Sequence, residues 1–181
     1  MKKLMLVFFL SSLFLFGCQS SLNTPTSIVE NFFSKYQKLD KTILKDLDKV
    51  VEKDKNMNKE EKTKYKTLME KQYNNLSYKI KNEKVNKNKA IIDVEIEVLD
   101  YANAIYKARK YYFEHPKEFN YTIENNSVEN TSNYINYKLK KIDEVKEKNK
   151  YEITLTLTKK EGLWSIDEIT DIDRMKIHGL Y

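Results

Sequence analysis

The sequence predicts an α+β domain in which an antiparallel sheet of at least four strands packs on amino-terminal helices. Three observations lead to this prediction. The chain after residue 25 spaces its apolar residues as helices do, two later segments alternate apolar and polar residues as strands do, and a further helical pattern separates those two segments. The predicted order is therefore three helices, a hairpin, two helices and a second hairpin.

The chain begins with a charged head and an apolar run that ends at its only cysteine. Lys2 and Lys3 precede residues 4–16, which are apolar except for two serines. A helix needs about 20 apolar residues to cross a bilayer, so this run is too short to span. One interpretation is a core helix with a buried thiol. The run has no polar face, however, and its length and charged head are typical of a secretory signal peptide.

The end of the apolar run, LFGC at residues 15–18, resembles the bacterial lipobox, in which a small residue precedes an obligatory cysteine. The resemblance implies that residues 1–17 are a lipoprotein signal peptide, that Cys18 receives a thioether-linked diacylglycerol, and that residues 18–25 are a lipidated tether. At about 0.8 kcal/mol per buried methylene, two acyl chains anchor a protein stably. We therefore expect an exported protein, bound to membrane lipid through acylated Cys18, with its domain on the outer side of the cell membrane.

Residues 26–181 would then form a single domain, which is long enough to bury a core without disulfides. Removal of residues 1–17 takes two lysines away, so the net charge falls from +6 to +4. Because the positive charge is spread among acidic residues, it predicts a solvated surface; the alternative is attraction to anionic lipid head groups or an anionic wall polymer. No motif of interleaved aromatic and basic residues is present, so nucleic acid is not expected as a partner.

Cap residues and apolar spacing place three helices before the first strand. Thr24 and Pro25 begin the first helix, and Asp40 begins the second. Asn58, with Glu61 three residues later, forms a capping box at the start of the third. The predicted apolar stripes are Ile28, Phe32, Tyr36 and Leu39, then Ile43, Leu47 and Val50, then Tyr65, Leu68, Met69, Tyr73 and Leu76.

The apolar period then changes from helical to two. Tyr78 and Ile80 begin a hairpin that turns at residues 86–89, and a second hairpin turns at residues 159–162. The residues predicted to face inward are Ile92, Val94, Ile96, Val98, Ile153, Leu155 and Leu157, with Trp164 and Ile166 on the last strand. Asp93, Glu95 and Glu97 share the opposite face, where they could meet water, lysines of a neighbouring strand or a partner.

A helical insertion at about residues 101–148 separates the two hairpins. Asp100 is the predicted cap of its first helix, Pro116 lies just past the end of that helix, and Ser127 is the predicted cap of the next. The predicted stripes are Tyr101, Ile105, Ala108 and Tyr112, then Val128, Ile135, Leu139, Ile142 and Val145.

The order of elements resembles the nuclear-transport-factor-2-like (cystatin-like) domain of small bacterial lipoproteins. The resemblance covers nearly all of the mature chain and rests on the lipobox, on the Thr-Pro start of the first helix, and on a Gly-x-Trp-x-Ile strand, here residues 162–166. It implies a cone between sheet and helices that often holds a small ligand. Such folds host enzymes, binders and structural modules alike, so the resemblance does not select a function.

Motifs for catalysis are missing from the sequence. Cys18 is consumed by the predicted anchor, and the bases available to a serine nucleophile are His115 and His178. His115 precedes Pro116 at a predicted helix end, where a cation interacts favourably with the helix dipole. His178 lies in the terminal tail KIHGLY, which we expect to be loosely held. No HExxH, CxxC or glycine-rich phosphate loop occurs.

Four acidic residues near the end of the chain raise the question of a metal. Asp167, Glu168, Asp171 and Asp173 carry the oxygen ligands that hard cations prefer, but they lack the glycine and the distal glutamate of an EF-hand loop. The favoured interpretation is a solvated strand end. We therefore expect no metal and no cofactor.

Tyrosine is the remaining candidate for a binding site, because it joins apolar area to a polar tip. The candidate pocket or interface residues are Tyr36, Tyr101, Tyr106, Tyr112 and Trp164. The alternative is ordinary packing in the core and at its rim. Enzymes of the resembled fold that move protons need a carboxylate inside the cone, and the predicted inward strand positions carry none.

The function expected from these patterns is that of a non-enzymatic surface lipoprotein. Its domain would bind an envelope protein, an anionic wall polymer or a small apolar ligand. One alternative is an isomerase- or dehydratase-like enzyme of the same fold, which a deep cavity with a buried carboxylate or histidine beside tyrosines would favour. Another is an accessory subunit of a secretion or conjugation apparatus.

Overall fold

The computed structural model describes residues 23–119 and 132–181. The predicted signal peptide and Cys18, and the predicted cap Ser127 with Val128, lie outside the described residues. The elements are α1 (Pro25–Gln37), α2 (Lys41–Lys53), α3 (Lys59–Asn75), β1 (Ser77–Asn86), β2 (Lys89–Leu99), α4 (Tyr101–Glu114), the 3-10 helix η1 (Pro116–Phe119), α5 (Ser132–Asp143), β3 (Lys148–Lys160), β4 (Leu163–Ile166) and α6 (Asp171–Ile177). The predicted α+β class is confirmed.

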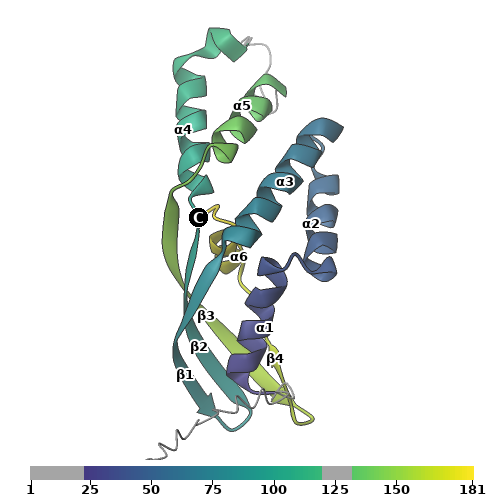
Figure 1. The fold of residues 1–181 in the computed structure, drawn as a ribbon, viewed down its shortest axis with the longest axis vertical. Helices are drawn as coiled ribbons and strands as arrows, with labels where there is room; N and C mark the ends of the chain where they lie inside the picture. Colours follow the sequence, from purple (N-terminus) through teal and green to yellow (C-terminus); the bar gives the residue numbers. More distant parts are fainter. Residues whose placement is uncertain (1–22, 120–131) are drawn as a thin grey trace, which may run out of the picture.

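The two predicted hairpins join into one antiparallel sheet in the order β1-β2-β3-β4. They join because β2 pairs with β3 along its whole length, from Lys89 opposite Thr158 to Leu99 opposite Lys148. The predicted inward positions of β2 and β3 are buried, and α1 and α3 lie against this face of the sheet (Figure 1). Residues 101–147 connect β2 to β3 and carry α4 and α5, as the prediction of a helical insertion between hairpins requires.

The outer face of the sheet carries a lattice of ion pairs. Glu95 on β2 contacts Lys81 on β1 at 3.0 Å and Lys150 on β3 at 3.7 Å. Glu97 contacts Lys148 at 3.6 Å and Lys150 at 3.8 Å. The sequence left water, lysines of a neighbouring strand or a partner as alternatives for this acidic row. The structure shows Glu95 and Glu97 paired with lysines of the neighbouring strands.

The predicted helix starts at Thr24, Asp40, Asn58 and Asp100 are confirmed. In each case the side chain accepts a hydrogen bond from a backbone N–H in the first turn of the helix. Asn58 and Glu61 form the predicted capping box. These side chains satisfy donors that the helix itself leaves unpaired, which explains why the helices begin there.

The apolar stripes of two helices differ from the prediction. In α2, Val51 is 1% exposed while Val50, the predicted stripe residue, is 67% exposed. Val51 lies four residues after buried Leu47 and shares its face, whereas Val50 is turned about 100° away, since the helix has 3.6 residues per turn. In α1 the centre of the stripe is likewise one residue later than predicted, at Val29 and Phe33, and Ile28 and Phe32 are partly buried beside them.

The prediction of a loose carboxyl-terminal tail is wrong. Thr170 caps the short helix α6, and the tail after it is bound to buried Gln72 of α3. The Gln72 side chain donates to the carbonyls of Leu99 (2.8 Å) and His178 (2.9 Å), and its oxygen accepts from Leu99 N–H at 2.8 Å. The Ala102 N–H donates to the Gly179 carbonyl at 2.8 Å. The tail therefore joins α3, β2 and α4.

The same region changes the interpretation of the acidic residues. Asp171 and Asp173 lie in the first turn of α6, not on a strand, and Asp173 N–H donates to the cap Thr170. Negative side chains are favourable at a helix amino terminus because of the helix dipole. Asp167 does lie at a strand end, just past β4, where Thr158 Oγ1 donates to it at 2.7 Å.

The helical insertion extends beyond one end of the sheet, and the turns of both hairpins lie at the opposite end (Figure 1). A second apolar cluster of Tyr112, Phe119 and Tyr134 packs inside the insertion, apart from the main core. None of the helices in the described ranges combines the length and the apolar character needed to cross a bilayer.

Candidate functional site

The five aromatic residues that the sequence singles out lie in different places. Tyr101 is buried at the start of α4 and donates to the Leu68 carbonyl at 2.9 Å, and Tyr112 belongs to the second cluster. Trp164 is buried in β4, and Tyr106 is exposed on α4. Tyr36 lines a hollow in the helical part of the domain. The structure therefore does not gather the five into one pocket.

A small hollow of about 160 Å³, which we call the histidine pocket, lies between α1, α2, α3 and α6. Its polar lining is formed by Tyr36, Asp46, Tyr65, Tyr73, Arg174 and His178. The rings of Tyr36 and Tyr73 meet edge to face at 5.1 Å between centroids. The Tyr73 hydroxyl lies 3.4 Å from His178 Nε2. No local pattern in the sequence indicates this pairing, because it depends on how the tail folds back onto α3.

Burial sets the protonation of this pocket. Desolvation, helped by the positive charge of Arg174, lowers the pKa of His178 from 6.5 to about 4, so its imidazole is neutral at neutral pH. Burial also raises the pKa of Tyr36, Tyr65 and Tyr73, whose phenols stay protonated. At neutral pH the pocket therefore presents the neutral His178 ring and neutral phenols beside the charged side chains of Asp46 and Arg174.

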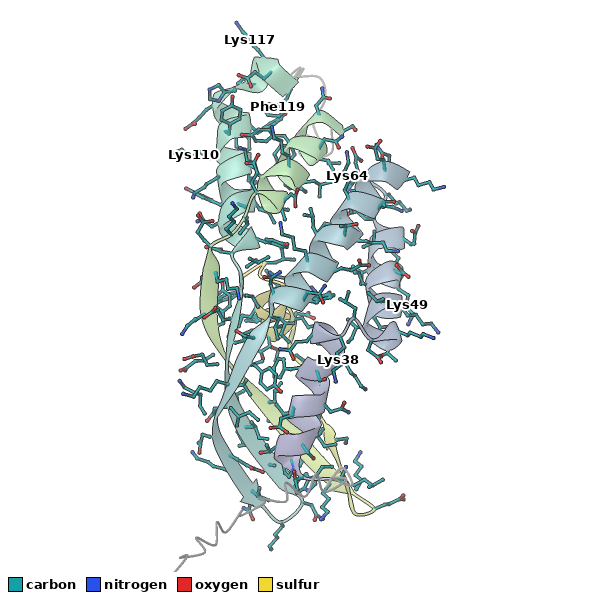
Figure 2. The ribbon with its side chains drawn as sticks, in the orientation of Figure 1. Lys38, Lys49, Lys64, Lys110, Lys117 and Phe119 are labelled. Carbon is teal, nitrogen blue, oxygen red and sulfur yellow. The ribbon has the colours of Figure 1, made fainter. Side chains whose placement is uncertain are left out.

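A larger hollow of about 430 Å³, the interhelical cleft, lies between α2 and α4 over a floor formed by α3 and α5, which pack against each other. Figure 2 shows Lys64 of α3 beside α5, where its ammonium donates to Asn136 Oδ1 at 3.3 Å. The apolar lining consists of Val50, Val51, Met57, Tyr65, Ile105, Tyr134, Ile135, Leu139, Ile142 and Leu180. Val50 and Tyr65 also line the histidine pocket, so the two hollows adjoin. The exposure of Val50, unexpected from the sequence, is explained by its place on this wall.

Charged side chains stand on the walls of the cleft. Arg109 of α4 and Lys138 of α5 lie on one side, and Asp54, at the end of α2, lies on the other. The Arg109 guanidinium is 5.8 Å from the Phe113 ring centre, and Lys138 Nζ is 5.7 Å from that of Tyr134. Cation–π contacts of this kind position cations over aromatic faces. The cleft thus combines an apolar floor with a cationic wall.

A buried carboxylate near the cleft has a structural explanation. Glu61 is buried where α3 and α5 begin, and it accepts hydrogen bonds from the Asn58 N–H (2.8 Å), the Asn136 amide (3.0 Å) and the Ser132 hydroxyl. The capping box predicts the first of these bonds. The other two come from α5, over 70 residues later, and no local pattern indicates them. Glu61 joins the two helices that form the cleft floor.

Within residues 23–119 and 132–181, no three His, Cys, Asp or Glu side chains are grouped so that they could hold a metal ion. Comparison of the chain with protein-family models, with curated proteins and with solved structures found no match. The interpretation of the cleft and the histidine pocket therefore depends on their geometry and chemistry.

Proposed function

We propose that this chain is a membrane-anchored surface lipoprotein and that its domain is a non-enzymatic binding module. Its ligand is a small apolar molecule with an anionic end, bound in the interhelical cleft. The observation that carries the proposal is the cleft itself, whose volume of about 430 Å³ falls in the range of ligand sites, roughly 300–1,000 Å³. Apolar walls supply affinity, and Arg109 and Lys138 supply the complement for an anionic group.

The anchor is tested by removing its acyl acceptor. In cells fed a labelled fatty acid, Cys18→Ala abolishes labelling of the protein and releases it from membranes or leaves it as an unprocessed precursor. Gly17→Ala is the matched control, because it keeps a small residue before the cysteine and retains the label. A Cys18→Ala protein that still carries lipid would contradict the anchoring proposal.

The cleft is tested with anilinonaphthalene sulfonate, an apolar anion whose fluorescence rises in apolar sites. Val50→Asp puts a like charge on an exposed wall residue, and Lys138→Glu reverses a wall cation. Each is expected to weaken dye binding about tenfold, a loss of about 1.4 kcal/mol. The controls, Ile172→Asp on α6 and Lys117→Glu in η1, make the same changes away from the cleft. Equal dye affinity in all four variants and the parent chain would refute the site.

The histidine pocket favours a second candidate, a proton-transferring enzyme. His178 beside Tyr73 is the kind of pair that such an enzyme uses. A histidine with a pKa of about 4 is a weak base at neutral pH, however, and the pocket volume of about 160 Å³ suits a very small substrate. Isomerase or dehydratase turnover that His178→Gln abolishes while the fold is retained would replace the binding-module proposal with this one.

A further inference from the structure

One end of the molecule gathers three segments that are far apart in the sequence. The start of α1, the β1–β2 turn and the β3–β4 turn lie together there, opposite the α4–α5 end (Figure 1). Two hydrogen bonds tie them: Trp164 N–H of β4 donates to the Asn23 side chain, and Lys159 N–H donates to the Asn88 carbonyl at 2.8 Å. The described chain therefore begins at the tip that carries both turns.

Cations concentrate on this tip. Its two turns and the end of β1 carry Lys84, Lys87, Lys89, Lys159 and Lys160, together with Glu83 and Glu161. Lys89 is near Asp167 (3.7 Å), and Lys159 lies over the Trp164 ring. Among the described residues, Lys84, Lys87 and Lys160 have no carboxylate within ion-pair distance. The lysines on the outer face of the sheet differ, because Lys81, Lys148 and Lys150 are held by Glu95 and Glu97.

Two apolar side chains are exposed beside these lysines. Val85 is 53% exposed next to the first turn, and Leu163 is 63% exposed next to the second. Leu163 is directed outward because it alternates with buried Trp164, and Val85 pairs with Ala90 near the hairpin turn. We call Lys84, Val85, Lys87, Lys160 and Leu163 the turn surface. Apolar tips surrounded by lysines are a combination suited to a membrane interface.

We propose that the turn surface contacts an anionic lipid bilayer. Each lysine close to an anionic leaflet contributes about 1 kcal/mol, or roughly a fivefold gain in affinity, and the apolar side chains enter the interfacial region. Asn23 lies five residues after Cys18, and five extended residues span at most about 18 Å. This span brings the turn surface to the membrane only if Cys18 is anchored there, as proposed above. The lysines and apolar side chains of the turn surface are present whether or not Cys18 is acylated. The contact directs the interhelical cleft away from the membrane.

The experiment uses Trp164, the only tryptophan, which lies beside the turn surface and reports its distance from the membrane. The purified full-length chain is reconstituted into vesicles that contain dansyl-labelled lipid, made of phosphatidylcholine alone or mixed with phosphatidylglycerol. Energy transfer from Trp164 is expected to be higher with phosphatidylglycerol. Raising the salt to about 0.5 M is expected to remove the difference, because the Debye length then falls to a few ångströms.

Charge reversal identifies the surface. A triple variant, Lys84→Glu, Lys87→Glu and Lys160→Glu, is expected to reduce transfer to the phosphatidylcholine value. The control is Lys55→Glu, Lys107→Glu and Lys117→Glu, a set that lies elsewhere in the domain and is equally free of ion pairs among the described residues. It changes the net charge by the same amount and keeps the response to phosphatidylglycerol. Thermal melts monitored by circular dichroism verify that both triple variants are folded.

Several results would overturn the proposal. One is equal energy transfer from Trp164 in vesicles with and without phosphatidylglycerol. Another is an increase with phosphatidylglycerol that persists in the Lys84→Glu, Lys87→Glu and Lys160→Glu variant. The double variant Val85→Ser and Leu163→Ser distinguishes a membrane from an anionic wall polymer. If the surface contacts the membrane, this variant loses energy transfer from Trp164. If energy transfer is unchanged and soluble polyphosphate competes with the vesicles, the surface is assigned to a polymer. Mass spectrometry of the Cys18 peptide tests the anchor independently. If Cys18 carries no acyl group, the anchoring proposal fails, and the same vesicles mixed with the unlipidated chain still decide the surface.

Discussion

The sheet half and the helical half of this domain bury their interiors in different ways. Under the sheet, the inward residues of β2 are branched aliphatic side chains with no exposed surface, packed against α1 and α3. In the helical insertion, a separate cluster is aromatic and built on Tyr112, Phe119 and Tyr134, with the Tyr112 and Tyr134 rings 4.9 Å apart. The two hollows described above both lie among the helices.

The difference explains why the two hollows lie among the helices. Paired strands are held about 4.8 Å apart by their hydrogen bonds, so one sheet covered by helices closes its interior. Helix pairs pack at about 8–10 Å, and where two pairs diverge the space between them must be filled by long side chains or left open. Here α3 packs against α5, α2 packs on α3 and α4 packs on α5, and the interhelical cleft is the space left between α2 and α4.

Two phenylalanine truncations give the largest expected effect and test whether the halves are separate. Phe33→Ala removes a fully buried ring that stacks on Tyr78 at 4.7 Å in the main core, and should lower the free energy of unfolding by about 4 kcal/mol. Phe119→Ala in the second cluster should lower it by about 2 kcal/mol, since that smaller cluster can collapse around the loss. Urea unfolding measures both.

Hydrogen exchange shows whether each of these two phenylalanine variants loses stability locally or throughout the domain. Phe119→Ala should speed amide exchange in α4 and α5 while β2 and β3 stay protected, because elements with few buried contacts open independently. Uniform acceleration throughout the domain would show one cooperative unit and would break the comparison between the halves.

Acid should weaken the domain through His178, which joins the tail to the helical half. Its pKa is about 4 in the folded protein and about 6.5 when unfolded, so between these values the unfolded chain binds more protons and stability falls as the pH is lowered. Since a tenfold change in proton affinity corresponds to about 1.4 kcal/mol, the loss from pH 6.5 to pH 4 is about 3 kcal/mol. Desolvation is the larger cause of this lowered pKa, and the positive charge of Arg174 adds to it by repelling the protonated ring.

The measurement compares urea unfolding at several pH values for the parent chain and for His178→Gln. The variant cannot take up a proton at this position, so its stability should depend less on pH across this window. Parallel pH curves for the two proteins would contradict the role given to burial of His178.

Alanine substitutions at two glycines test the hydrogen-bonded junction between the halves. At the junction, the free energy of unfolding is expected to fall by about 2–3 kcal/mol. Gly179 has φ +68°, and a Cβ there would overlap Gln72 Nε2 and the Leu99 carbonyl. Gly162, in the β3–β4 turn, has φ +84° and open space around its Cα. Gly162→Ala should lower the free energy of unfolding by about 1 kcal/mol, because its positive φ is unfavourable for alanine. Gly179→Ala should lower it by about 2 kcal/mol more, because the new Cβ also overlaps Gln72 and Leu99. Equal melting temperatures for the two variants would contradict the tight packing of the tail.

Local patterns predicted most of the fold. Alternation in β2 and β3 gave the inward faces, and polar residues before apolar runs gave the starts of α1 to α4, because each signal depends on neighbours within a few residues. Where the apolar pattern was degenerate, the prediction failed: Val50 and Val51 both fit a helical stripe, and only the position of α3 decides which one is buried. The tail was missed because its partner, Gln72, lies about 100 residues earlier.

The candidate site was much less predictable than the fold. The sequence drew attention to the tyrosines, and Tyr36 does line a hollow, but Tyr101 and Trp164 are packing residues elsewhere. The interhelical cleft depends on how four helices pack together, which no spacing of residues along one helix encodes. Glu61 illustrates the same limit, because its cap was predictable and its burial under α5 was not.

The smallest expected effect concerns the outer face of the sheet, compared with an exposed ion pair on a helix. The Lys81 ammonium donates to Glu95 and, with Lys150 nearby, holds the pKa of that carboxyl below its usual range. Glu95→Gln should lower the urea midpoint slightly at low salt, and the loss should disappear at high salt, because exposed pairs are weak and screened. Glu60→Gln on α3, which removes a pair with Lys64 at 2.8 Å, is the matched control. Since Glu95 contacts two lysines across three strands and Glu60 contacts one lysine on its own helix, the strand variant should show the larger salt dependence. A larger dependence for Glu60→Gln would show that the lattice contributes nothing beyond its separate pairs.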